Sequence, residues 1–297
     1  MCLMTYTYLP DRTVFRLQGP DTDELLQGII TQDVTKVRVD APKFAAMLNA
    51  QGKLLYDFFL IRIDDNTLLL DCDARHSDAL FKKLKMYKLR ANVRIEDQSD
   101  AWQVHAGWDN PPPNPWPESA IIFTDPRLNT LGWRALTPSD VAPASDDAPA
   151  TTDDYAAHRI ACGAPTAADD ATERMVVLDL GYDALHAVDF AKGCYVGQEV
   201  TARMHYRHVR RKAIFHIESR QPLPAQGTEI MAGTSKIGEL CSTHGTNGLA
   251  LLRVEELEKA QAAQTPLSAN GIALTATLPA WFTETLAHIR AQAAKAQ

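Results

Sequence analysis

The sequence lacks long apolar runs and an excess of basic residues, and it lacks several familiar cofactor motifs. The longest apolar runs, such as 58–61 and 120–123, are far too short to span a bilayer. The net charge of −7 argues against a general nucleic-acid binder, which needs a basic surface. The absence of a strand–GxGxxG–helix unit argues against a Rossmann dinucleotide site, and no HExxH motif indicates a zinc enzyme.

Cysteine is scarce, and its spacing is uninformative for metals. The five cysteines form no CxxC pair, which argues against a zinc site and against an iron–sulfur cluster held by this chain, so no permanently bound metal is predicted. The start of the chain lacks the charged first residues, the apolar core and the small-residue cleavage site that are typical of a signal peptide. We therefore expect free thiols, no membrane association and a cytoplasmic location.

Hydrophobic patterning predicts mixed α and β structure in two or three domains, as the length of 297 residues suggests. A helix is predicted over 23–30, where four aliphatic residues share one face and form core. A second helix is predicted over 77–89, and strands are predicted over 13–17, 54–63, 67–71, 93–96, 102–106, 121–124 and 133–136. Together these elements predict an α+β sandwich. Short strands with glycine-rich turns after residue 212 predict a small antiparallel barrel, followed by a helix from residue 283.

The stretch from Lys192 to Arg207 concentrates chemically capable groups. Gly193 and Gly197 bracket Cys194, and the residues from 199 to 204 read as a short helix. A helix N-terminus and the nearby Lys192 both favour a thiolate, so Cys194 and Lys192 are candidate catalytic residues. The alternative interpretation is that Cys194 is a small buried hydrophobe.

Two further features each have two interpretations. Asp57 interrupts the apolar strand 54–63, and it either points to the solvent face of a half-exposed sheet or accepts hydrogen bonds from a heterocycle. A basic cluster begins within the second half of the stretch from Lys192 to Arg207 and continues past it. This cluster is either a solvated strand edge or a docking surface for an anionic ligand tail. The cluster comprises Arg203, Arg207, Arg210, Arg211 and Lys212, with His205 and His208 between them.

The run Lys-Gly-Cys-Tyr-Val-Gly-Gln-Glu from Lys192 to Glu199, followed by Ala202 and Arg203, resembles the signature of the folate-binding YgfZ family. That family is related to the T-protein (aminomethyltransferase) of the glycine cleavage system. Weaker family features lie in the same order over most of the chain, in the stretches 26–33, 49–57 and 159–165. The unbroken eight-residue match is the specific part of the resemblance.

The resemblance implies a fold of the T-protein type, a three-domain ring of α/β sandwich domains and a small C-terminal antiparallel β-barrel. The expected domains are 1–45 with 146–207 as a discontinuous first domain, 46–145 as a second α+β domain, and 208–297 as the barrel. It also implies a protein that binds tetrahydrofolate and supports assembly or repair of iron–sulfur clusters, with bacterial links to tRNA-thiolating enzymes. The implied partners are iron–sulfur client or scaffold proteins, without direct binding to nucleic acid. The protein itself is expected to be a monomer or a weak dimer.

The resemblance also implies site residues. The signature cysteine, Cys194, is the functional thiol, and the folate-binding candidates are Asn49, Asp57, Tyr195, Gln198, Glu199, Arg203 and Arg207. Arginine forks suit the carboxylates of a folate tail, and a carboxylate suits the guanidine-like edge of a pterin.

The chain departs from the T-protein at a paired-aspartate position, where Tyr56 and Asp57 stand instead, and Gly52-Lys53 replaces a double glycine. The loss of one carboxylate leaves aminomethyl transfer as the alternative to the accessory role. A third possibility is a scaffold whose ligand pocket is vestigial.

Overall fold

The computed structural model describes residues 5–112, 116–141, 150–169, 173–208 and 210–295. The chain divides into two compact units. Unit 1 contains Met1–Leu48, Tyr56–Tyr155 and Leu185–Val196, and unit 2 contains Asn49–Leu55, Ala156–Ala184 and Gly197–Gln297. Helix α3 (Thr152–Ala161) begins in unit 1 and ends in unit 2. The expected three-domain division stays a prediction, and its boundary between residues 145 and 146 lies outside the described residues.

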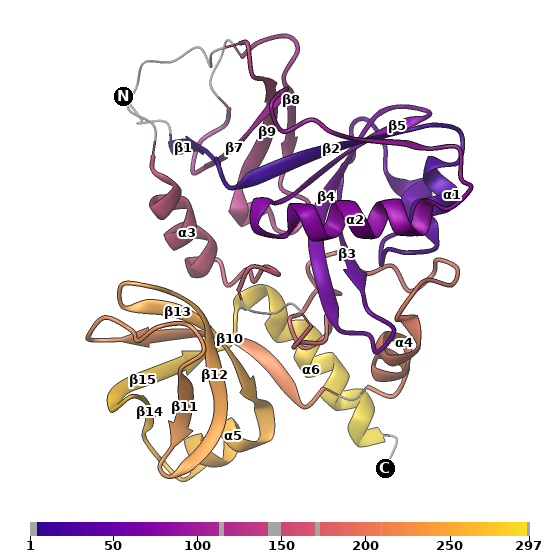
Figure 1. Cartoon of the computed structure of the whole chain (residues 1–297). Helices are drawn as coiled ribbons and strands as arrows, with labels where there is room; N and C mark the ends of the chain where they lie inside the picture. The colour runs from indigo at the N-terminus through magenta and orange to yellow at the C-terminus, as the bar shows by residue number, and fades with distance from the viewer. Residues whose placement is uncertain (1–4, 113–115, 142–149, 170–172, 209, 296–297) are drawn as a thin grey trace. The chain divides into compact units, whose positions relative to one another are not determined.

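In the described part of unit 1 the chain forms a five-stranded and a four-stranded sheet together with helices α1 and α2, and helix α3 begins there (Figure 1). The five-stranded sheet has the order β3 (Lys43–Leu48), β4 (Leu54–Asp64), β5 (Thr67–Asp73), β2 (Arg12–Gln18), β6 (Arg94–Asp97). The four-stranded sheet has the order β1 (Thr5–Tyr8), β7 (Trp102–Trp108), β9 (Trp133–Pro138), β8 (Ile121–Thr124). The helices are α1 (Thr22–Gln27) and α2 (Ser77–Lys88), with 3-10 turns η1 (Val34–Lys36), η2 (Ala74–His76) and η3 (Asn129–Leu131).

Strand β4 is the centre of the unit 1 core. Every residue from Leu54 to Ile61 is buried, because β4 is an inner strand whose two faces are both covered. Helix α2 packs on the same sheet through Phe81, whose ring lies 5.1 Å from that of Phe15 on β2. The near-continuous apolar run that predicted this strand is thus explained by burial on both sides.

Helix α1 is shorter than the sequence predicted. It ends at Gln27 with Gly28 as its C-cap, and Ile30 instead forms an isolated β-bridge with Met47. Leu26, Ile29 and Ile30 are all buried, so the prediction that this stretch belongs to the core is confirmed. Glycine is a poor residue for a helix interior, and burial of Ile30 against β3 stabilises the extended path.

Unit 2 contains a closed antiparallel barrel, which confirms the barrel predicted for the C-terminal part of the chain (Figure 1). The strand order is β10 (Lys212–Ser219), β13 (Asn247–Arg253), β12 (Ser235–His244), β11 (Glu229–Ala232), β14 (Leu267–Ala269), β15 (Ile272–Thr277). Strand β15 pairs with β10 and thereby closes the barrel without free edges. The helices are α4 (Gln198–Tyr206), α5 (Val254–Ala262) and α6 (Ala280–Lys295).

Candidate functional site

The signature loop, defined here as Lys192 to Val196, lies in unit 1 and is fixed to the segment that follows α1. Because α1 ends early, the carbonyl oxygens beyond it are free to accept hydrogen bonds from outside the helix. Val196 N donates to Gly28 O at 3.2 Å. Lys192 Nζ donates to Ile30 O at 2.6 Å and to Gln32 O at 2.8 Å. The loop is thus held at both ends.

Thr31 and Gln32 extend this attachment to the residues before the loop. Thr31 Oγ1 donates to Ala187 O at 2.6 Å, and Gln32 Nε2 donates to His186 O at 2.6 Å. Asp189 N in turn donates to Thr31 O at 3.0 Å. Neither Thr31 nor Gln32 was a predicted site residue, although both lie in the stretch 26–33 that carries part of the resemblance. Their role depends on partners more than 150 positions away.

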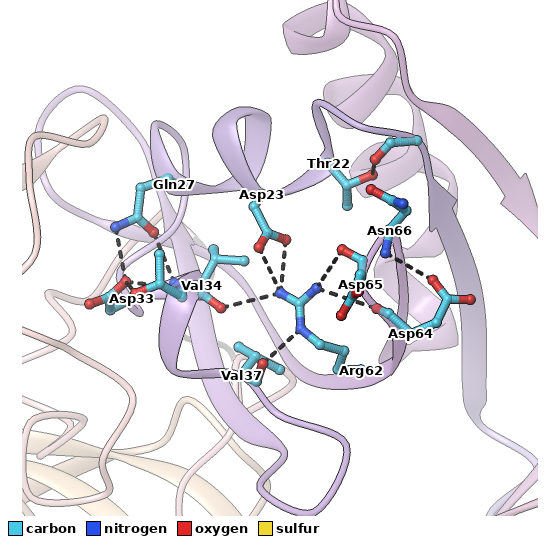
Figure 2. A network of polar contacts seen from close by, with 12 residues as sticks. Thr22, Asp23, Gln27, Asp33, Val34, Val37, Arg62, Asp64, Asp65 and Asn66 are labelled. Atoms are coloured by element: carbon cyan, nitrogen blue, oxygen red, sulfur yellow. Dashed lines mark hydrogen bonds and ion pairs between the residues drawn. The ribbon is translucent and has the colours of Figure 1, made fainter.

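Arg62 on β4 bonds to the chain before and after the segment 28–32, at Asp23 and at Val37 (Figure 2). Its Nη2 lies 2.8 Å from both carboxylate oxygens of Asp23 in α1, and its Nε donates to Val37 O at 2.7 Å. Gln27 Nε2 also donates to Asp33 Oδ1, and Gln27 Oε1 accepts from the backbone of Val34 (Figure 2). A planar guanidinium with several fixed acceptors holds these turns in one geometry.

Lys192 is buried, with a residue exposure of 7%. Burial lowers the pKa of Lys192 from 10.5 to about 8, and the charges of Asp33 and Asp189 oppose that shift. Its ammonium group also lies 5.0 Å from the ring centroid of Tyr195, within the range of a cation–π interaction. The structure therefore gives Lys192 and Tyr195 a shared place in the loop, with the Lys192 ammonium bonded to backbone carbonyls.

Cys194 is exposed, and it differs in this from the other cysteines that the structure describes. Cys72 and Cys241 are buried, and burial raises the pKa of both thiols. Cys162 is half-buried, with its sulfur 3.6 Å from His158 Nε2. The alternative that Cys194 is a small buried hydrophobe is therefore wrong.

Asp57, in contrast to Cys194, is buried, with a residue exposure of 5%. The interpretation that it points to a solvent face is therefore wrong. It belongs to the inner strand β4, whose two faces are covered. Burial lowers the pKa of the Arg12 guanidinium, but the charges of Asp71 and, more weakly, Asp57 outweigh burial and raise it. Asp57 is thus a buried carboxylate close enough to the Arg12 guanidinium for its charge to act on that cation.

Asn49, in unit 2, builds the turn between β3 and β4. Its Oδ1 accepts hydrogen bonds from the backbone N–H groups of Gln51 and Lys53, both at 3.0 Å. Gly52 adopts a φ of 73°, and a Cβ at this position would lie 2.8 Å from the Cβ of Val200. Glycine therefore allows the turn to pack directly on the first turn of α4.

Helix α4 confirms the short helix predicted after the signature. It carries three of the predicted folate-binding residues, Gln198, Glu199 and Arg203, and a fourth, Arg207, is its C-cap. Its N-cap is Gly197 in the left-handed conformation. Arg203 and Arg207 are exposed. Arg210, from the same basic cluster, is instead paired with Asp183 at 2.8 Å and has a side-chain exposure of 3%. The cluster is therefore not one continuous surface.

The predicted site residues divide between the units. Lys192, Cys194, Tyr195 and Asp57 belong to unit 1, whereas Asn49 and the α4 residues belong to unit 2. Among the described residues, no three His, Cys, Asp or Glu side chains gather as a metal site. No helix in the described part of the chain is long and apolar enough to cross a membrane.

Two models of known protein families match separate parts of this chain. A family model described as the GCVT N-terminal domain matches residues 12–106, and one described as the CAF17 C-terminal beta-barrel domain matches residues 211–284. The human mitochondrial iron–sulfur cluster assembly factor IBA57 is 32% identical over 302 residues, which cover 92% of this chain and 84% of that protein. The chain belongs to the IBA57 family.

Further IBA57 proteins agree with this assignment. The mouse protein is 31% identical over 92% of this chain and 84% of its own, and the Pyricularia oryzae homologue is 33% identical over 84% and 72%. The relatives are related to the YgfZ family but do not belong to it, which corrects the family expected from the signature. They are also named as mitochondrial, so the expectation of a cytoplasmic protein is wrong.

A solved structure confirms the predicted fold type. The glycine cleavage system aminomethyltransferase T from Bartonella henselae matches with a TM-score of 0.75, over 94% of this chain and 86% of that one. Its sequence identity is 15%, so the likeness concerns the fold alone. This chain of the IBA57 family thus has a T-protein-type fold. The names of the relatives state iron–sulfur cluster assembly and do not support the expected link to tRNA modification.

Proposed function

We propose that this protein is a folate-binding accessory factor for the assembly or repair of iron–sulfur clusters in client enzymes, with Cys194 as its functional thiol. The observation that carries the proposal is the exposure of Cys194 on a loop whose flanking residues are anchored to the protein interior. An exposed thiol on a fixed loop can reach a partner protein, whereas Cys72 and Cys241 are buried.

The relatives support the general role, because the human, mouse and fungal proteins are all named iron–sulfur cluster assembly factors. Those names do not favour aminomethyl transfer, and the T-protein shares only its fold with this chain. A cluster is the cargo in this role. Iron–sulfur clusters are usually held by several cysteine thiolates, so Cys194 alone would act together with ligands from a client or scaffold protein.

Tetrahydrofolate is the cofactor that the T-protein resemblance implies, and each unit, taken by itself, contains groups with suitable chemistry for part of it. Asp57 is a buried carboxylate that can accept hydrogen bonds from a pterin edge, and burial strengthens such bonds. Arg203 and Arg207 are exposed cations suited to a carboxylate tail. Asn49 fits less well, because its side-chain oxygen already accepts two backbone hydrogen bonds. Bound tetrahydrofolate would supply a reduced carrier of one-carbon units.

The thiol role is tested in cells that lack their own IBA57, complemented with wild type, Cys194→Ser or Cys162→Ser. We expect Cys194→Ser to lose most of the activity of cluster-containing enzymes while its protein level stays normal. Cys162→Ser is the matched control, because Cys162 is half-buried beside His158. Full complementation by Cys194→Ser would remove the thiol from the proposal.

Folate binding is tested by anaerobic thermal unfolding with and without tetrahydrofolate. A ligand that binds the folded state raises its stability by mass action. We expect wild type and Cys194→Ala to be stabilised equally, and Arg203→Ala combined with Arg207→Ala to respond less. Arg220→Ala is the control, because Arg220 is another exposed arginine of unit 2. Absence of any shift for wild type would favour a scaffold with a vestigial pocket.

A further inference from the structure

Helix α2 and the turn after it concentrate positive charge in an acidic protein. Six of the thirteen residues from Lys82 to Arg94 are Lys or Arg, and none is Asp or Glu. The rest of the chain has 24 Lys and Arg residues against 37 Asp and Glu residues. A local excess of one charge against the opposite background can attract a partner of the other sign.

The inner face of α2 belongs to the core, so only its outer face is available to a partner. Leu80 and Leu84 are fully buried. The outer face ends in what we call the basic stripe, whose five residues are all exposed: Lys82, Lys85, Met86, Leu89 and Arg90. Positions 82, 85, 86 and 89 follow the three- and four-residue spacing of one helical face. The stripe lies entirely within unit 1 (Figure 1).

The cations of the stripe are not neutralised by carboxylates of the chain. Among the residues that the structure describes, no ion pair includes Lys82, Lys85 or Arg90. The one acidic residue of α2 is Asp78, in its first turn. Lys85 Nζ lies 4.1 Å from the centroid of the Phe81 ring, so its aliphatic part follows the helix surface. These charges remain available to an external anion.

Two apolar side chains are exposed among these cations. Met86 is 55% exposed and Leu89 is 86% exposed. Leu89 also has a φ of 44°, in the left-handed region that favours glycine and that a bulky side chain rarely adopts. The chain thus keeps a large leucine in solvent at a position where glycine would be less strained, and burial within the chain does not explain this choice.

The composition of the stripe distinguishes among anionic partners. Nucleic acids bind cations and stack on aromatic rings, but they give exposed aliphatic side chains little to contact. Protein interfaces are depleted of lysine. Aliphatic side chains surrounded by lysines are typical of segments at a membrane surface, where the apolar groups enter the acyl boundary and the ammonium groups stay beside the phosphates.

We propose that the basic stripe is a peripheral docking surface for a bilayer rich in anionic phospholipid. Met86 and Leu89 enter the boundary between headgroups and acyl chains, and the three cations of the stripe contact lipid phosphates. Because only two apolar side chains insert, the binding is weak, reversible and sensitive to salt. Docking of this kind needs no membrane-spanning helix, and it does not involve Cys194 or folate.

The test is sedimentation of the purified full chain with vesicles at low salt. Vesicles of phosphatidylcholine mixed with an equal amount of phosphatidylglycerol are compared with vesicles of phosphatidylcholine alone. We expect the protein to bind the anionic vesicles at least tenfold more strongly, and high salt to release it. No binding to the anionic vesicles, or equal binding to both kinds, would overturn the proposal.

Charge variants tie the binding to α2. Lys82→Gln combined with Lys85→Gln removes two cations, and each cation near an anionic surface contributes about fivefold to the partition coefficient, so we expect a loss of at least tenfold. Lys236→Gln combined with Lys259→Gln is the matched control, because it changes the net charge equally at two exposed lysines of unit 2. Equal binding by the two double variants would mean that the stripe has no special role and would overturn the assignment.

Leu89→Gly separates membrane docking from attraction by charge alone. Glycine relieves the left-handed strain, so the unfolding temperature should stay the same or rise, while loss of the aliphatic group should weaken vesicle binding at least threefold. Leu89→Met keeps an apolar side chain and should bind like wild type. Unchanged vesicle binding by Leu89→Gly would leave a purely electrostatic surface, suited to a nucleic acid or an acidic protein, and would overturn the membrane assignment.

Discussion

Replacement of Lys192 by methionine tests the inference that a buried ammonium group fixes the signature loop. Methionine has a similar length but no donor, so the carbonyl oxygens of Ile30 and Gln32 lose their bonds to Nζ. A hydrogen bond from a charged donor contributes about 1.5–3 kcal/mol, and removal of the buried charge offsets part of this loss. We expect Lys192→Met to lower the free energy of unfolding by about 1–3 kcal/mol at pH 7.5.

The pH dependence gives the sharper test. Burial lowers the pKa of Lys192 from 10.5 to about 8 in the folded protein. Between these two values the unfolded chain binds more protons than the folded one, so stability rises with pH. From pH 7.5 to pH 9.5 this effect adds about 2 kcal/mol to wild type and nothing to the variant. The difference between the two proteins should therefore widen by about that amount.

The assay is urea denaturation of wild type and Lys192→Met at pH 7.5 and pH 9.5. Other groups that titrate in this range contribute equally to both proteins and cancel in the difference. Lys82→Met, at an exposed position of α2, is the control and should show no pH-dependent difference from wild type. A difference that stays constant or narrows at high pH would refute the inference that Lys192 is held as a desolvated ammonium.

Three further predictions concern other positions. Gly52→Ala should destabilise unit 2 by about 3 kcal/mol, from left-handed strain and overlap with Val200, whereas Gly271→Ala, with a φ of 81° and open space around a Cβ, should cost about 1 kcal/mol. Equal losses in thermal unfolding would contradict the overlap. Burial raises the pKa of Asp179 to about 6, so between pH 4 and pH 6 this group binds more protons in the folded state and lowers the stability of wild type relative to Asp179→Asn as pH rises. The stability difference in favour of Asp179→Asn should grow to about 3 kcal/mol at most at pH 7, as calorimetry of both proteins can measure. Thr31→Val removes hydrogen bonds to two backbone segments, and we expect faster amide exchange across residues 185–196; unchanged exchange would contradict the attachment of the loop.

Local patterns predicted most strands correctly, because alternation and apolar runs are encoded within each segment. The predicted strand 54–63 is β4, and the predicted strand 121–124 is β8. The sequence-based predictions missed β3, β14 and α5, although α5 buries Val254, Leu257 and Ala260 along one face. For α1 the helical pattern continued past Gly28, but the pairing of Ile30 with Met47 ended the helix earlier.

The sequence by itself determined the mixed architecture, the C-terminal barrel and the position of the signature around Cys194. Only the tertiary structure decided that Cys194 is exposed and that Asp57 is buried. It also decided that Lys192 bonds to carbonyl oxygens about 160 residues away. Periodicity describes which face of an element is apolar, but it carries no information on which distant backbone group a polar side chain will meet. Those partners are fixed only when the segments pack together.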